Sequence, residues 1–343
     1  MPRVVISGYF GLGNAGDEAV LAATVAMLRA RLPGVEPVAL TADPLTTNAL
    51  HGIAGVPRMA PRRLLAALRG ADLLLSGGGS LLQDATSLRS LLYYLAVLAV
   101  AQRVGCRTMV FAQGIGPLRR PVSRRLVRRV VDRVEAVTVR DEASAALLRE
   151  VGVRRPPIEV TADPVFALAP VEAPIAPPPG RPRIAVALRP WPGAEGAAQA
   201  VAAALPAGAS VQIWPLHLPY DLPVARELAS RLPAARLIDV PLRPAQWIGL
   251  ARTVDVVVAA RLHALIFAAV AGVAAVAIDY DPKVAALRER LGLPDGGPLT
   301  TLDPKRLAAA IGAAKPPALE GVAALADAAR RNVEIAASLL PAA

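Results

Sequence analysis

Arg261, His263 and Lys283 are the residues whose types could together bind an acid and transfer a proton. Arginine holds a carboxylate or phosphate through two hydrogen bonds, lysine supplies a compact positive charge, and an imidazole exchanges a proton near neutral pH. Lysine and histidine each occur only three times in a chain with 38 lysines and arginines, so both stand out here. Taken singly, such residues often cap a helix or pair with a neighbouring acid. Their combination predicts an anion site with His263 as the proton carrier.

The elements around these residues would bring them to one edge of a sheet. Residues 254–260 are apolar and largely β-branched, which predicts a strand buried on both faces, and residues 264–278 predict a buried helix and the next strand. Arg261 and His263 then follow the carboxyl end of one strand, and Lys283 follows that of the next. Ligands of open α/β sheets bind at this edge, where a helix N-terminus also favours an anion.

Other polar residues follow short apolar runs in the same way. They are Arg140, Arg189, and His217 with Asp221 four residues later. We expect Arg140 to have the same strand-end geometry in the first half of the chain. We expect the other three to share one sheet edge in the second half.

A glycine-rich loop follows the first predicted strand, residues 3–7. One interpretation of this loop is a dinucleotide-binding site. Its glycines at 11, 13 and 16 satisfy the G-x-G-x-x-G spacing of dinucleotide-binding folds. However, these glycines begin several residues after the strand, and Asp17 and Glu18 put two negative charges where a pyrophosphate would bind. Carboxylates suit sugar hydroxyls better, so we expect this loop to approach a neutral, hydroxyl-rich ligand.

A second glycine loop, Gly77, Gly78 and Gly79, follows the strand predicted for residues 72–76. Consecutive glycines expose backbone N–H groups and let a ligand approach closely, although such a run can equally be a mobile turn. The first half of the chain then has two loops of a ligand-binding type, which favours a ligand-binding role for Gly77–Gly79.

The composition limits the classes of function. Hydrophobic residues make up 54% of the 343 residues, but aromatic residues are only 3% and do not alternate with the arginines, which argues against nucleic acid as a partner. The formal charge of +11 suits an anionic membrane surface or an acidic small substrate. The single cysteine, Cys106, excludes an intrachain disulfide and a Cys/His zinc site and fits a reducing cytosol. We expect no metal and no bound cofactor.

No segment has the pattern of a targeting or membrane-spanning sequence. The chain opens directly into a predicted strand, and its longest apolar runs, residues 91–101 and 264–278, fall short of the roughly 18 residues that a spanning helix needs. Residues 121–134 predict a basic amphipathic helix, whose arginines form either a solvated face or a surface for anionic lipid. We expect a cytoplasmic protein that at most contacts the inner membrane face peripherally.

The alternation of strands and helices predicts an α/β fold with two Rossmann-like parallel-sheet domains facing a cleft, which is the glycosyltransferase-B arrangement. A proline-rich stretch marks the boundary between them. The expected parts are an N-terminal domain of residues 1–170, a linker of residues 171–182, a C-terminal domain of residues 183–317, and a C-terminal helix of residues 318–343 that could pack back across the halves.

The ordered set of motifs resembles the polysaccharide pyruvyl transferase family, in particular its branch acting on bacterial cell-wall polysaccharide. The resemblance spans nearly the whole chain, and the motifs, each weak alone, are specific in this order. They are residues 8–18 (GYFGLGNAGDE), 77–79 with Gln83 and Asp84, 113–117 (QGIGP), Arg140 with Asp141, Asp163 with Pro164, His217 with Asp221, 261–263 (RLH) and 279–283 (DYDPK).

The resemblance implies a reaction with phosphoenolpyruvate as co-substrate. The carboxyvinyl group is transferred to two hydroxyls of one sugar, typically O4 and O6, which forms a pyruvate ketal and releases phosphate. The acceptor would be an N-acetylhexosamine such as N-acetylmannosamine in a lipid-linked cell-wall precursor.

The same resemblance implies roles for the site residues. His263 would be the general acid that protonates the methylene carbon, and Arg261 and Lys283 would complete the catalytic group. The expected donor-binding residues are Arg140, His217, Arg261 and Lys283. The expected acceptor-binding residues are Asn14, Asp17, Glu18, Gly77, Gly78 and Gly79.

Three alternatives use the same residues differently. A nucleotide-sugar glycosyltransferase of the same architecture would use Arg261 and His263 on a diphosphate. A non-catalytic relative would only bind a sugar or an anion, and an oxidoreductase would bind a nicotinamide cofactor at the N-terminal glycine loop. Phosphate release from phosphoenolpyruvate, binding without turnover, and cofactor titration distinguish these functions.

Overall fold

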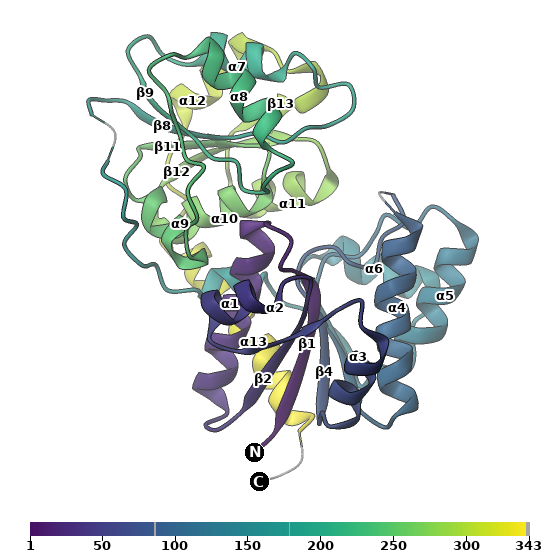
Figure 1. Ribbon diagram of the computed structural model, residues 1–343. Coiled ribbons are helices and arrows are strands. Elements are labelled where there is room, and N and C mark those ends of the chain that lie inside the picture. The colour runs from purple at the N-terminus through teal and green to yellow at the C-terminus, as the bar shows by residue number, and fades with distance from the viewer. Residues whose placement is uncertain (86, 178, 341–343) are drawn as a thin grey trace. The chain divides into compact units, whose positions relative to one another are not determined.

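The chain forms two compact units, each with its own sheet (Figure 1). The computed structural model describes residues 1–85, 87–177 and 179–340. Unit 1 comprises Met1–Ala167 together with the described residues from Leu325 onwards, and unit 2 comprises Leu168–Ala324. Residue 178 of the predicted linker and residues 341–343 of the predicted C-terminal helix lie outside the described residues.

Unit 1 is built on a seven-stranded parallel sheet with the order β3-β2-β1-β4-β5-β6-β7. The strands are β1 (Arg3–Phe10), β2 (Glu36–Thr41), β3 (Ala54–Pro57), β4 (Leu73–Gly77), β5 (Arg107–Gln113), β6 (Ala136–Val139) and β7 (Ile158–Val160). The strand order reverses its direction between β1 and β4. The two glycine loops follow these two strands, so they lie at the switch point where open α/β sheets bind ligands.

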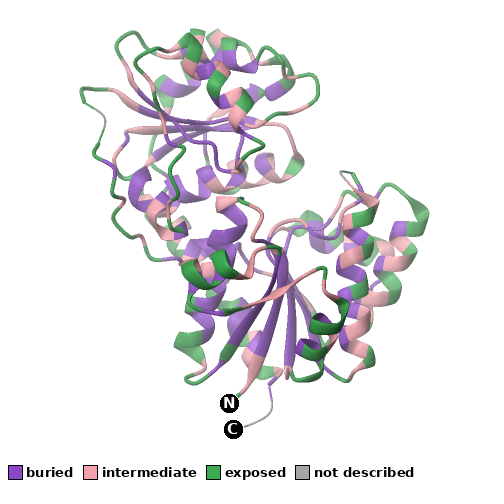
Figure 2. Ribbon diagram, in the orientation of Figure 1, coloured by how far each residue is buried: buried purple, intermediate pink, exposed green. Residues whose placement is uncertain are grey.

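Helices cover both faces of this sheet because alternate strand residues are apolar on both sides. Val5 and Leu74 pack in one layer with α3 to α6, whereas Ile6 and Leu75 pack in the other with α1 and α13 (Figure 1). The helical segments are α1 (Ala15–Arg31), α2 (Pro44–His51), α3 (Pro61–Arg69), α4 (Leu88–Arg103), α5 (Pro121–Val131), α6 (Glu142–Val151) and the 3₁₀ turn η1 (Pro164–Ala167). Figure 2 shows buried strands between helices whose outer faces are exposed.

Unit 2 has a six-stranded parallel sheet with the order β10-β9-β8-β11-β12-β13. Its strands are β8 (Arg183–Ala187), β9 (Ser210–Ile213), β10 (Arg236–Leu237), β11 (Val256–Ala259), β12 (Ala274–Asp279) and β13 (Asp295–Pro298). Its helical segments are α7 (Ala197–Ala204), α8 (Leu222–Arg231), α9 (Pro244–Ala251), α10 (Leu262–Ala271), α11 (Pro282–Leu291), η2 (Leu299–Thr301) and α12 (Pro304–Ala313). The switch point of this sheet lies between β8 and β11.

The last helix, α13 (Leu319–Ser338), completes the core of unit 1. Val333 and Ala336 belong to the apolar layer that also contains α1. The side chain of Asn332 is fully buried, accepts a hydrogen bond from Thr161 Oγ1 at 2.8 Å and donates one to the carbonyl of Ala162 at 3.1 Å. Unit 1 is therefore assembled from two segments far apart in sequence.

The predicted class, an α/β fold with two parallel-sheet domains, is confirmed. Over the part of the chain that is described, no helix combines the length and apolar composition needed to cross a bilayer.

Candidate active site

The loops that follow β8, β11 and β12 lie at one edge of the unit 2 sheet. Strand pairing aligns Ala259 of β11 with Ala187 of β8 and with Ala277 of β12. The backbone N–H of Arg261 then donates to the carbonyl of Ala187 at 3.3 Å. Arg261 is therefore fixed beside the β8 loop at the switch point, while Lys283 follows β12 at the start of α11.

Arg261 is held by a buried carboxylate. Its Nε donates to Asp221 Oδ2 at 2.9 Å and its Nη2 donates to Oδ1, while Asp221 has no exposed surface. Burial raises the pKa of Asp221 above its ordinary value, although the guanidinium of Arg261 and the backbone N–H of His217, 2.9 Å from Oδ2, oppose that shift. Nη1 of Arg261 makes no hydrogen bond among the described residues, so this end of the guanidinium can reach a ligand.

His263 is the second residue of α10 and immediately follows the start of that helix. Its imidazole is half-buried, with the ring centre 6.3 Å from that of Phe267, one turn along the helix. The first N–H groups of any α-helix lack acceptors within the helix, so this end of α10 favours an anion. His263 therefore places an imidazole, a group that can transfer a proton, at a helix start that favours an anion.

Lys283 forms a weak ion pair with Asp281, two residues before it. Its Nζ lies 3.5 Å from Asp281 Oδ2 and 5.5 Å from the centre of the Tyr280 ring, and its side chain is 25% exposed. Exposed ion pairs contribute only about 0–1 kcal/mol, so a substrate anion could replace Asp281 at small cost.

Arg189 belongs to the same group, although the sequence pattern predicted only its position at a strand end and assigned it no role. Its Nη1 donates to the hydroxyl of Tyr280 at 2.6 Å, and its guanidinium lies 4.4 Å from the Tyr280 ring centre and 5.0 Å from that of Trp191. Among the described residues no carboxylate lies within ion-pair distance of Arg189, whereas Arg261 and Lys283 each have one. Its position directly after a strand is the sequence feature that could have predicted a binding role for Arg189.

His217 contributes to this edge through its backbone. The N–H holds Asp221, and the imidazole packs against the ring of Tyr220 with 4.6 Å between centres. A donor-binding role for the imidazole itself stays a prediction.

Glu18 in unit 1 closes the N-terminal glycine loop. Its Oε1 accepts from the N–H of Gly11 at 2.7 Å, and its Oε2 lies 2.8 Å from Nε2 of His51, whose side chain is 1% exposed. His51 lies 33 residues away, and no sequence pattern connects the two. Nearby, Asn14 caps α1 by accepting from Gly16 N at 3.1 Å. Glu18 and Asn14 thus shape the loop, and their direct contact with an acceptor stays a prediction.

The two glycine loops pack closely against neighbouring atoms. A Cβ at Gly79 would lie 2.7 Å from Asp17 Oδ1, and a Cβ at Gly77 would lie 2.7 Å from the carbonyl of Phe111. Gly78 and Gly79 also have φ values of +91° and +71°, which other residues rarely adopt. Glycine is therefore required here by the backbone geometry itself, with or without a ligand.

Arg140 lies in unit 1 beside the glycine loops. Its Nη1 is 3.2 Å from Asp163 Oδ2 and its Nη2 donates to Ser80 Oγ at 3.0 Å, with the side chain 7% exposed. A Cβ at Gly114 would lie 2.7 Å from its Nη2. Arg140 thus links the loops after β4, β5 and β6, and its donor-binding role stays a prediction.

Within the described ranges, no group of three histidine, cysteine or acidic side chains is placed to hold a metal ion. The arrangement in unit 2 provides cations, an imidazole and a helix start, which suit an acidic small molecule and a proton transfer.

A family model described as polysaccharide pyruvyl transferase matches residues 14–282, a span that begins within the first glycine loop, includes the Gly77–Gly79 loop, Arg189 and Arg261, and ends one residue before Lys283. The chain belongs to the polysaccharide pyruvyl transferase family. No match was found among curated proteins.

Solved structures of other enzymes share the fold of this pyruvyl transferase family member. UDP-GlcNAc 2-epimerase from Methanocaldococcus jannaschii has a TM-score of 0.66 at 10% identity, covering 98% of this chain and 100% of that one. A putative UDP-N-acetylglucosamine 2-epimerase from Listeria monocytogenes has a TM-score of 0.63 at 13% identity, covering 96% and 94%. HepE from Anabaena, in complex with UDP and glucose, has a TM-score of 0.62 at 13% identity, covering 99% of each. These neighbours have the glycosyltransferase-B fold, which confirms the predicted fold type.

Proposed function

We propose that the protein transfers the carboxyvinyl group of phosphoenolpyruvate to two hydroxyls of one sugar. The product is a cyclic pyruvate ketal, with O4 and O6 as the attacking oxygens, and phosphate is released. Membership of the polysaccharide pyruvyl transferase family supports the reaction class. The observation that carries the donor assignment is the group at the β8–β11 switch point, where Arg261 and His263 begin α10.

The donor is a small molecule with a carboxylate and a phosphate, and unit 2 offers matching groups. Nη1 of Arg261 and Nζ of Lys283 can each engage one of the anionic groups. Arg189 can contribute a third contact, since its charge has no carboxylate partner among the described residues. The phosphate or carboxylate at the start of α10 would also accept from backbone N–H groups.

His263 would start the chemistry by giving its proton to the methylene carbon of the donor. C2 then becomes an electrophilic, oxocarbenium-like centre, and one sugar hydroxyl forms a bond to it. The C2–O bond to phosphate breaks, and the second hydroxyl attacks to close the ketal. One hydroxyl proton restores the imidazole, and the other leaves with the phosphate.

The acceptor in this proposal is an N-acetylhexosamine, such as N-acetylmannosamine, in a lipid-linked cell-wall precursor. Asp17 and the backbone N–H groups of the Gly77–Gly79 loop are the unit 1 groups proposed to contact it. Carboxylate and amide groups at a sheet switch point are suited to sugar hydroxyls.

The direct test incubates the protein with phosphoenolpyruvate and synthetic or lipid-linked aminosugar acceptors. Phosphate release and an acid-labile product detected by mass spectrometry are expected. Release of UDP from UDP-sugars with no phosphate release from phosphoenolpyruvate would instead favour a glycosyltransferase. Donor binding measured by calorimetry, without turnover across the acceptor panel, would favour a binding protein.

His263→Gln tests the proton-transfer step within the same assay. We expect single-turnover phosphate release to fall by roughly 10²–10⁴, since that is the usual contribution of a general acid. Calorimetric binding of phosphoenolpyruvate should remain within a few-fold of the wild type. An unchanged rate would remove His263 from the mechanism while leaving the reaction class intact.

A further inference from the structure

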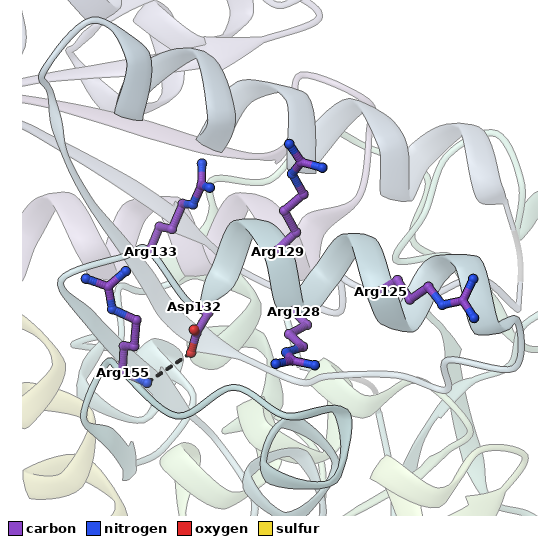
Figure 3. Close-up of a pocket in the computed structure, with 6 residues that line it drawn as sticks. All are labelled: Arg125, Arg128, Arg129, Asp132, Arg133 and Arg155. Atoms are coloured by element: carbon purple, nitrogen blue, oxygen red, sulfur yellow. Dashed lines mark hydrogen bonds between the residues drawn. The ribbon is translucent and has the colours of Figure 1, made fainter.

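Five exposed arginines line an open hollow on unit 1, formed by α5 and the segment after α6 (Figure 3). Its volume is about 400 Å³. Its lining consists of Arg125, Arg128, Arg129, Arg133 and Arg155, with Asp132 as the one acid. None of these residues belongs to the site proposed for the reaction.

The positive charge of this arginine surface is only partly balanced from within the protein, because Asp132 is the one acid in its lining. Among the described residues, none of its five arginines has a carboxylate within ion-pair distance. The backbone N–H of Arg154 donates to Asp132 Oδ1 at 2.6 Å, and that of Arg155 donates to the same oxygen at 2.9 Å. These hydrogen bonds lower the pKa of Asp132. By contrast, Arg124 of the same helix pairs with Glu150 at 2.7 Å.

Such a cluster has an energetic cost in the unbound protein. On α5, Arg128 and Arg129 lie three and four residues after Arg125. Like charges at these spacings on a helix repel one another. A polyanion would remove that repulsion, so the surface is suited to a partner with several negative charges.

The geometry indicates what kind of polyanion fits. In Figure 3 the side chains of Arg125, Arg128 and Arg129 point in different directions and do not converge on one point. A single phosphate would contact only part of the cluster, whereas a surface that carries many phosphates could contact all of it. None of the described residues that line the hollow is aromatic, so bases of a nucleic acid would find no stacking partner there.

The same helix offers little apolar surface to a bilayer. Val127 and Val131 are fully buried and form part of the unit 1 core, so most of the apolar face of α5 is already occupied, and Val122 at its start is half exposed. Contact with a membrane would therefore be electrostatic and peripheral.

We propose that this arginine surface docks the protein on a membrane containing anionic phospholipid. The phosphate headgroups would face α5 and Arg155, with no apolar insertion. This inference goes beyond the proposed reaction and does not depend on it, because vesicle binding requires neither donor nor acceptor.

The test measures sedimentation of the full chain with vesicles of phosphatidylcholine alone or mixed with phosphatidylglycerol. The wild type should bind only the anionic vesicles, and raising the salt from about 0.05 to about 0.5 M should abolish binding because the charges become screened. Each basic residue near an anionic surface contributes about fivefold to affinity. The variant with Arg125, Arg128, Arg129 and Arg133 all changed to Gln should therefore bind on the order of 600-fold more weakly, about fivefold for each of the four residues.

A matched control removes the same charge elsewhere in unit 1. Its four substituted residues are Arg62, Arg63, Arg69 and Arg103, all exposed and all changed to Gln. This control should keep vesicle binding, and circular dichroism should show both variants folded. Equal loss in the two variants, binding to neutral vesicles, or binding of pyrophosphate or single-stranded RNA with no vesicle binding would each overturn the proposal.

A second assay tests the membrane surface separately from the proposed reaction. It measures phosphate release from phosphoenolpyruvate with a synthetic acceptor in solution, where no membrane is present. The variant with the four substituted arginines of the arginine surface should retain wild-type turnover there if the protein is the proposed transferase. Loss of vesicle binding with unchanged turnover supports the membrane surface, and an inactive wild type that still binds vesicles contradicts only the reaction.

Discussion

At the scale of single residues, the cations of unit 2 differ mainly in how their charge is balanced. Arg261 is neutralised by the fully buried Asp221, Lys283 has only a partly exposed partner, and Arg189 rests on aromatic rings. A buried pair orients a guanidinium firmly but leaves it little freedom to bind a substrate. Lys283 and Arg189 are therefore the residues whose removal should affect the donor most directly.

The chain contains its own control for Lys283. Asp281-Pro282-Lys283 opens α11, and Asp303-Pro304-Lys305 opens α12, with each aspartate accepting from the N–H of its lysine, at 3.1 and 3.0 Å. A charge-assisted contact contributes about 1.5–3 kcal/mol. Lys283→Gln should therefore raise the KM for phosphoenolpyruvate by roughly ten- to a hundredfold, whereas Lys305→Gln should not. Equal effects in steady-state kinetics would rule out a special role for Lys283.

At the scale of elements, one acid of the glycine-loop segment fixes the start of α5. Asp84 is buried and accepts from the backbone N–H groups of Arg119 and Arg120 at 2.8 and 2.9 Å. Burial acts to raise the pKa of Asp84, but these hydrogen bonds outweigh it and lower the pKa below its ordinary value. Asp84 therefore connects the loop after β4 to the arginine surface.

Asp84→Asn should lower the free energy of unfolding of unit 1 by about 1–3 kcal/mol at pH 7, because it weakens two charge-assisted bonds. A carboxyl with a lowered pKa in the folded state contributes stability above its unfolded pKa and loses it as the pH falls through the folded value. The difference between wild type and variant, measured by urea denaturation with circular dichroism, should thus narrow below about pH 4. A difference independent of pH would show that the charge of Asp84 is unimportant.

At the scale of the whole molecule, the chain leaves unit 1 after η1 and returns to it in α13. Asn332 holds α13 in place on unit 1 through its buried side-chain amide. This amide hydrogen-bonds to the hydroxyl of Thr161 and to the carbonyls of Ala162 and Ala329. All three tryptophans, Trp191, Trp214 and Trp247, lie in unit 2. Tryptophan fluorescence therefore reports on unit 2 alone, while circular dichroism reports on both.

Asn332→Ala should destabilise unit 1 by about 1–3 kcal/mol, since it leaves buried polar partners without their bonds. The circular dichroism transition should shift to lower urea, while the tryptophan transition should stay in place. Asp327→Ala on the same helix removes an exposed ion pair with Arg330 and should change neither. A shift in tryptophan fluorescence as large as that in circular dichroism would mean that α13 does not stabilise unit 1 separately.

The amino-acid sequence by itself determined the two parallel sheets and the positions of Arg261, His263 and Lys283 at strand ends. These follow from local patterns, because a β-branched apolar run followed by a helix start fixes both the strand and what comes after it. The sequence patterns did not predict the edge strands β3 and β13, and the predicted elements differ at their ends, such as β1 continuing to Phe10 and α5 stopping at Val131.

Only the tertiary structure decided which groups meet. The partners Asp221 for Arg261, His51 for Glu18 and Asn332 for Thr161 lie 40, 33 and 171 residues away. No local pattern encodes such pairs, since burial and charge compensation depend on how distant segments pack together. The same packing left Arg189 and the arginines that line the hollow beside α5 without carboxylates within ion-pair distance among the described residues, which is why both can be proposed to bind anions.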